Sequence, residues 1–219
     1  LRRGIIDSGE LQGMIDDDGV RGVTSNPSIF EKAIAGSGDY EDAIAELAAE
    51  GLEPGDIYER LAVEDIQRGT DLFRRMWDET DGQHGFVSLE VNPHLARDTS
   101  GTIEEARRLW ADVDRPNVLI KVPATKEGLP AIQQLIAEGI NVNVTLLFGL
   151  PRYAEVAEAY IAGIEERVSR GESVYRITSV ASFFLSRIDV LVDPMLKVKA
   201  QGEGREAQIA KKLYGQVAI

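Results

Sequence analysis

A lysine stands inside a short apolar run of the sequence, in a position that ordinary packing does not explain. Lys121 is flanked by Ile120 and Val122 within residues 117–123. Lysine is almost never fully buried unless it is paired. Burial disfavours the charged form of an amine, and a neutral amine can attack a carbonyl to form a Schiff base. We therefore expect Lys121 to be a nucleophile for carbonyl chemistry.

A carboxylate accompanies this lysine in the preceding apolar run. Glu90 lies in residues 86–93, and a carboxylate beside a Schiff base can move protons, an effect worth about 10²–10⁴-fold in rate. Glu90 could equally be only the counter-charge of Lys121. Because an iminium draws electrons from a neighbouring C–C bond, the pair indicates class I aldolase-type chemistry, which needs neither a metal nor a cofactor.

Small polar side chains recur in every run that resembles a strand. Parallel strands are buried on both faces and are normally continuous in Val, Ile and Leu, so each buried polar group must be paired or used. A single Asn or Thr is usually a hydrogen-bonded structural residue, and it is the joint occurrence that indicates a site. Side-chain alternation in strands pairs Thr24 with Asn26, Ser88 with Glu90, Asn143 with Thr145, and Thr178 with Ser182 on one face each.

The elements that must position these residues alternate along the chain. Short β-branched runs are separated by stretches with helical spacing, a pattern that predicts a parallel α/β sheet. The expected helices are 100–113 with Ser100 as N-cap, 151–169 with Pro151 at its start, and 205–219. Residues 28–80 read as two or three helices that break at Pro54-Gly55. The expected strands lie within 19–27, 86–93, 117–123, 140–148 and 174–184.

Polar groups at five strand ends favour a closed barrel over an open sheet. An open doubly wound sheet binds its ligand at one switch point between strands. In a barrel, all strand ends converge on one axis, and the active site lies at their carboxyl-terminal face. We therefore predict a TIM (β/α)8 barrel.

Composition excludes several classes of protein. The 219 residues carry a formal net charge of −13 and are 43% hydrophobic, which is typical of one globular domain and unfavourable for nucleic acid or a membrane surface. The absence of cysteine excludes disulfides and thiolate chemistry and fits a cytoplasmic location. No apolar run approaches the ~18–20 residues of a membrane span. The two histidines, His84 and His94, have no metal-binding spacing and are expected on the surface or in loops.

At these same residues the sequence resembles the transaldolase family, in its bacterial branch. The matching segments are GVTSNPSIF (22–30), VLIKVPAT (118–125), INVNVTLLF (140–148) and SVASFFLSRID (179–189). They occur in the family's order, and the resemblance covers essentially the whole chain. It implies transfer of a dihydroxyacetone unit between sugar phosphates: sedoheptulose 7-phosphate and glyceraldehyde 3-phosphate give erythrose 4-phosphate and fructose 6-phosphate, in the pentose phosphate pathway.

The resemblance also implies catalytic roles for three residues. Lys121 would form the Schiff base with C2 of the ketose. Glu90, together with Thr145 through a water molecule, would handle protons while the Schiff base forms and breaks down.

Five further residues would bind the substrate. Asn26, Asn143 and Ser182 would hold the dihydroxyacetone hydroxyls, with Thr24 supporting Asn26. Arg187 would bind the substrate phosphate, for which a planar guanidinium is suited; without the family match it reads equally as a surface arginine.

The chain departs from the family at both ends. The resemblance places the first barrel strand and its catalytic Asp before residue 1, and strands 7 and 8 beyond residue 219. Asp7 could substitute for this Asp, but we interpret it as an acidic residue at a helix N-terminus. Residues 1–219 are thus expected to form one partial barrel domain with a helical insertion at 28–80.

Three alternatives stay open at this point. The first is a fructose-6-phosphate aldolase, which shares the fold and the lysine but lacks the long insertion. The second is the transaldolase domain of a fusion to glucose-6-phosphate isomerase. The third is an inactive binding protein on the same fold.

Overall fold

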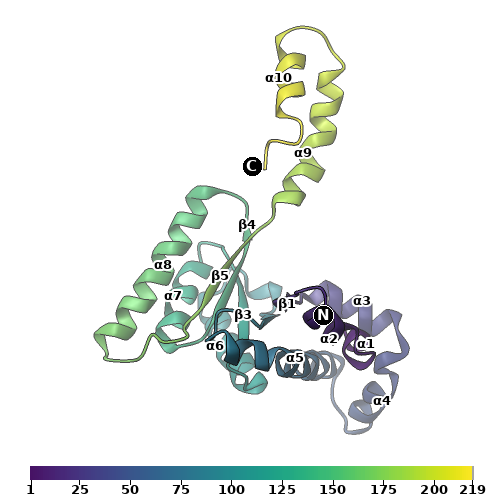
Figure 1. Cartoon of the computed structure of the whole chain (residues 1–219), viewed down its shortest axis with the longest axis vertical. Coiled ribbons are helices and arrows are strands. Elements are labelled where there is room, and N and C mark those ends of the chain that lie inside the picture. Colours follow the sequence, from purple (N-terminus) through teal and green to yellow (C-terminus); the bar gives the residue numbers. More distant parts are fainter. Residues whose placement is uncertain (219) are drawn as a thin grey trace.

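Five parallel strands form one curled sheet in the computed structural model, which describes residues 1–218 (Figure 1). Strands that follow one another along the chain are neighbours in the sheet, so the order is β1-β2-β3-β4-β5. The predicted α/β class is confirmed, and the curled sheet is that of a partial TIM barrel. The strands are β1 (Gly22–Thr24), β2 (Phe86–Glu90), β3 (Val118–Pro123), β4 (Val142–Leu147) and β5 (Ser179–Phe183).

Helices make each connection between strands, as parallel pairing requires. The predicted helix at 151–169 is confirmed, with Pro151 in its first turn, where the missing N–H costs nothing. The helices are α1 (Arg3–Asp7), α2 (Glu10–Asp16), α3 (Pro27–Gly36), α4 (Glu41–Ala49), α5 (Pro54–Glu79), α6 (Thr99–Val113), α7 (Gly128–Glu138), α8 (Leu150–Ser169), α9 (Leu185–Ala200) and α10 (Arg205–Leu213), with 3-10 turns η1 (Gly38–Tyr40) and η2 (Pro93–Leu95).

The long segment between β1 and β2 is helical, as predicted. It forms α3, η1, α4 and the 26-residue α5, and Pro54 is the first residue of α5. A buried charge network fastens α1 and η1 to α5: Asp65 accepts hydrogen bonds from Arg3 Nε at 2.9 Å and from the Tyr40 hydroxyl at 2.7 Å. The outer helices are thereby tied to the helix that covers β2.

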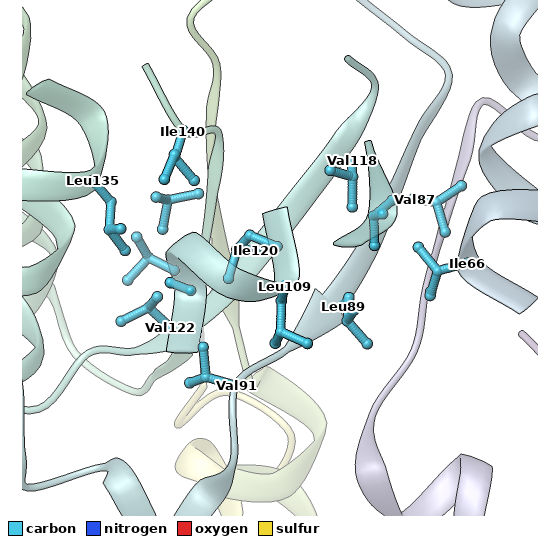
Figure 2. Packing of buried hydrophobic residues seen from close by; sticks show 14 of the residues in the cluster. Ile66, Val87, Leu89, Val91, Leu109, Val118, Ile120, Val122, Leu135 and Ile140 are labelled. Atoms are coloured by element: carbon cyan, nitrogen blue, oxygen red, sulfur yellow. The ribbon is translucent and has the colours of Figure 1, made fainter. Parts of the chain in front are cut away.

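The hydrophobic core lies between the outer face of the sheet and the helices α5, α6 and α7 that cover it (Figure 2). Ile120 and Val122 of β3 point into it and are fully buried. They pack with Leu109 of α6 and Leu135 of α7 in one cluster of buried residues. Alternation along β3 therefore sends Lys121 to the opposite, inner face of the sheet.

Helices α9 and α10 pack on each other and stand away from the sheet (Figure 1). Apolar side chains of α9 such as Val190, Leu191 and Val198 are largely exposed, and Val180 of the edge strand β5 is partly exposed. The residues that the structure describes thus leave an apolar face uncovered on β5 and α9.

Two helix-terminus predictions are wrong. Asp98, rather than Ser100, caps α6: its side chain accepts from Gly101 N at 3.0 Å, and its extended backbone suits the position. Ser100 is already inside the first turn. Asp7 ends α1 instead of starting a helix, and its carboxylate pairs with Arg68 of α5.

The last predicted helix is shorter than expected. α10 ends at Leu213, so the prediction of a helix over 205–219 holds only for its first part, and residue 219 lies outside the described residues.

Candidate active site

A cavity of about 350 Å³ opens at the carboxyl ends of the strands. Loops and strand ends from β1 to β5 contribute to its wall, which is the arrangement that the polar strand ends predicted. Seven of the eight predicted site residues line it: Thr24, Asn26, Glu90, Lys121, Thr145, Ser182 and Arg187. The eighth, Asn143, contacts this group through a hydrogen bond.

Lys121 is buried and held by two acceptors. Its Nζ donates to Glu90 Oε2 at 2.9 Å and to the backbone carbonyl of Ser25, also at 2.9 Å. The two side chains come from neighbouring strands in direct register and are 8% and 15% exposed. A proton can therefore pass directly from the ammonium to the carboxylate, leaving an amine at the cavity wall.

A chain of hydrogen bonds crosses the inner face of the sheet. Ser182 of β5 donates to Asn143 Oδ1 at 2.8 Å, and Asn143 Nδ2 donates to Ser88 Oγ at 3.0 Å. The Ser25 hydroxyl in turn donates to the Ser88 carbonyl at 2.7 Å. Because buried polar groups are costly unless paired, this network explains how the strands tolerate them. It fixes the orientation of Ser182 at the cavity wall.

Thr145 lines the cavity beside a bulge in β4. The register with β5 shifts between Val144 and Leu147, which oppose Ala181 and Phe183. Leu146 absorbs the extra residue in a left-handed conformation, with φ of 62°. Such conformations are unfavourable for residues other than glycine and are tolerated where the surroundings enforce them. Thr145 is 1% exposed, with its side chain at the cavity.

The loop between β1 and α3 supplies Thr24 and Asn26. Asn26 caps α3, accepting from Ile29 N at 2.8 Å through its side-chain oxygen. Its amide nitrogen is then the group that can donate to a ligand in the cavity. The Thr24 hydroxyl donates to the Ser25 carbonyl at 3.3 Å, so it supports the loop.

Arg187 lies at the rim of the cavity, in the first turn of α9. Its guanidinium stacks on the ring of Phe184, 4.4 Å from the centroid. A helix N-terminus attracts anions, and here a cation is held beside it. The arrangement is suited to a phosphate group.

A second cavity, of about 380 Å³, adjoins the first and shares Glu90 with it. It lies among residues of α3, α5, η2 and α6, and Tyr58 of α5 is one of its walls. Burial, followed by the negative charges of Glu90 and Glu31, raises the pKa of Tyr58 to about 12. Glu90 thus lines both cavities.

Other polar residues lie outside the site. Asp7 and His84 do not line the cavity that contains Lys121, and exposed His94 borders only the second one. A larger hollow of about 630 Å³, beside α5, is rich in acidic side chains and contains none of the candidate residues. Among residues 1–218, no cluster of three His, Cys, Asp or Glu side chains could hold a metal ion. Within the same residues, no helix has the length and apolar character of a membrane span.

Sequence reasoning did not single out several residues of this site. Ser25 acts through its backbone carbonyl, a role that residue type does not reveal. Leu146 and Phe184 line the cavity as apolar side chains among polar ones. The one available indication was position, because Ser25 immediately precedes the predicted Asn26, and Phe184 lies in the segment before Arg187.

Comparisons with known proteins agree with this geometry. Residues 5–218 match the family model described as Transaldolase/Fructose-6-phosphate aldolase. The chain is 48% identical to the transaldolases of Trichodesmium erythraeum and of Saccharopolyspora erythraea, and 46% identical to transaldolase 2 of a Nostoc species. All of this chain aligns in each case, but it spans only 57–58% of the length of these relatives. The chain belongs to the transaldolase/fructose-6-phosphate aldolase family.

Proposed function

We propose that this chain carries the Schiff-base site of a transaldolase. The reaction would move a dihydroxyacetone unit between sugar phosphates, from sedoheptulose 7-phosphate to glyceraldehyde 3-phosphate, in the pentose phosphate pathway of the cytoplasm. The observation that carries the proposal is the contact of Lys121 Nζ with Glu90 Oε2, at 2.9 Å on a cavity wall. The relatives named transaldolase support it.

Catalysis would begin with proton transfer from Lys121 to Glu90. The amine then attacks the C2 carbonyl of the ketose, and water leaves to give a protonated imine. Glu90 can return its proton to the departing hydroxyl, and Thr145, which lines the same cavity, would hold that water. The pair thus serves as nucleophile and proton carrier in the same step.

Cleavage of the bond between C3 and C4 follows from the charge on the imine. The bonding electrons move into the iminium, forming an enamine, and the aldehyde sugar phosphate leaves when its C4 hydroxyl loses a proton. Glu90 is the one carboxylate in the wall of the described cavity, and it is already paired. The base for the C4 hydroxyl is therefore not assigned within residues 1–218.

Retention of the enamine would depend on the polar strand ends. Asn26, Ser182 and, behind it, Asn143 offer donors and acceptors for the dihydroxyacetone hydroxyls. The network that fixes Ser182 and Asn143 pre-organises them. The enamine carbon then attacks an acceptor aldehyde, and hydrolysis of the new imine restores Lys121.

Arg187 and the N-terminus of α9 would anchor the phosphate of the ketose at the cavity rim. Free dihydroxyacetone release, the reaction of a fructose-6-phosphate aldolase, is the alternative outcome. The helices between residues 27 and 79 favour the transferase, because compact aldolase relatives lack such an insertion.

Borohydride trapping tests the proposal. Incubation with fructose 6-phosphate and borohydride should reduce the imine to a stable secondary amine, which peptide mass spectrometry should locate on Lys121. Lys121→Met is the matched negative variant. A coupled assay with and without erythrose 4-phosphate then separates transferase from aldolase. Absence of any adduct, with folding verified by circular dichroism, would refute Schiff-base chemistry in this chain.

A further inference from the structure

Ser25 is a buried residue in the loop that joins β1 to α3. It is 1% exposed, and two of its groups bind one acceptor. Its hydroxyl donates to the Ser88 carbonyl at 2.7 Å, and its backbone N–H donates to the same oxygen at 3.3 Å. These bonds fasten the loop to β2. Ser25 does not line the cavity that contains Lys121 (the reaction cavity), and it borders only the adjoining second cavity.

The carbonyl of Ser25 is one of the two acceptors that hold Lys121. Its distance to Nζ, 2.9 Å, equals that of Glu90 Oε2. A carbonyl can keep its direction only if its peptide plane is fixed, and three anchors fix this one. The Ser25 hydroxyl binds β2, the Thr24 hydroxyl donates to the carbonyl itself at 3.3 Å, and Asn26 caps the following helix.

We propose that Ser25 is a positioning residue for Lys121, whose buried hydroxyl holds the Ser25 carbonyl against the lysine amine. This inference rests on the Schiff-base function proposed above. Lysine has a long, flexible side chain, and productive attack needs the amine about 3–3.5 Å from the carbonyl carbon. With Glu90 alone, Nζ could pivot about a single contact. The second contact, from the Ser25 carbonyl, fixes its place.

The expected kinetic effect is a fall in turnover without a fall in substrate affinity. A displacement of about 1 Å in a reacting group costs on the order of 100-fold in rate. Ser25→Ala removes one of three anchors of the carbonyl, so we expect trapping to slow by about 10- to 100-fold at saturating substrate. The substrate concentration that gives half the maximal trapping rate should change less than twofold, because Ser25 does not line the reaction cavity.

The test compares Ser25→Ala with a matched buried hydroxyl elsewhere. Thr102 of α6 is 2% exposed and donates to the Leu95 carbonyl at 3.0 Å, outside the reaction cavity. Thr102→Val therefore loses the same kind of bond. Trapping rates with fructose 6-phosphate and borohydride are measured over a range of substrate concentrations, and melting temperatures are recorded for each variant. Ser25→Cys keeps the size with a weaker donor and should give an intermediate rate.

The outcomes separate the two proposals. If the unsubstituted chain forms no adduct, the Schiff-base function fails, and the positioning role fails with it. If it forms the adduct and Ser25→Ala traps as fast as Thr102→Val, only the positioning role is refuted. A rise in half-saturation at unchanged maximal rate would also overturn it, since that pattern means lost binding. If Ser25→Ala does not fold, an unchanged rate in folded Ser25→Cys refutes the role.

Discussion

Replacing Glu90 by glutamine tests whether the lysine–carboxylate pair is as buried as the structure shows. The substitution keeps the size and one hydrogen-bond acceptor but removes the charge. At the 2.9 Å separation of Nζ and Oε2, Coulomb's law with an effective dielectric constant of about 20 gives about 6 kcal/mol before desolvation. Desolvation of both ions offsets much of this energy. Removing one partner of a buried pair nevertheless costs about 3–5 kcal/mol, because the other charge stays behind.

We expect Glu90→Gln to lower the free energy of unfolding by about 3 kcal/mol, slightly moderated by the amide oxygen that replaces the carboxylate. Lys121→Met should cost about the same. The double variant should lose about 2–3 kcal/mol less than the sum, because neither ion is then left unpaired. Urea unfolding at pH 7, followed by circular dichroism, measures each term of this double-mutant cycle.

An exposed pair on α5 provides the control for this cycle. Arg75 Nε and Glu79 Oε1 are also close, at 2.7 Å, but the side chains are 86% and 60% exposed. Exposed pairs at this helical spacing couple by about 0.3–0.5 kcal/mol. If the Glu90–Lys121 cycle gives a coupling as small as the one between Arg75 and Glu79, the pair is solvated and the reasoning is refuted.

Three further predictions follow from single contacts. Arg187→Ala should raise half-saturation for fructose 6-phosphate about 10- to 100-fold, since charge-assisted phosphate contacts are worth about 1.5–3 kcal/mol; trapping of unphosphorylated dihydroxyacetone should not change, and equal losses for both substrates would contradict the assignment. Tyr58 has a folded-state pKa raised to about 12, so the stability tied to its neutral form is present below pH 10 and is lost as pH rises towards 12. Tyr58→Phe should make the urea midpoint depend less on pH over this range. If the variant keeps the same dependence on pH, Tyr58 is not buried. Gly128→Ala should destabilise by about 3 kcal/mol or more, because its Cβ would meet the Pro123 carbonyl at 2.1 Å, whereas Gly13→Ala in open space should be neutral or stabilising by urea unfolding.

The sequence was most informative where periodicity and burial act together. A lysine between two apolar β-branched residues leaves few interpretations, and the structure places Lys121 on the inner face as alternation requires. The polar residues Glu90, Thr145 and Ser182 could be singled out in a similar way, since buried polar groups in parallel strands must be paired or bind a ligand. The five strands and the long helical segment also follow from simple spacing rules.

Local competition between neighbouring polar residues was less predictable. Asp98 and Ser100 are both good helix caps by type, and the geometry of the turn before α6 decides between them. The position of Asp7 at the end of α1 was also not predictable, because its ion pair with Arg68 depends on how α1 lies against α5. The role of Ser25 rests on the direction of a backbone carbonyl, which every residue type possesses.

The central place of β3 in the sheet has a consequence for dynamics. Both edges of this strand are hydrogen bonded, to β2 where Glu90 opposes Lys121 and to β4 where Asn143 opposes it. Segments of this kind open only when the whole protein unfolds, whereas edges and protruding helices fluctuate at little cost. Lys121, the proposed nucleophile, is therefore expected in the slowest-exchanging part of the chain, while Arg187 on α9 belongs to a part that can fluctuate. Under the proposed function, a helix that adjusts would bind the substrate phosphate without loosening the strand that carries the amine.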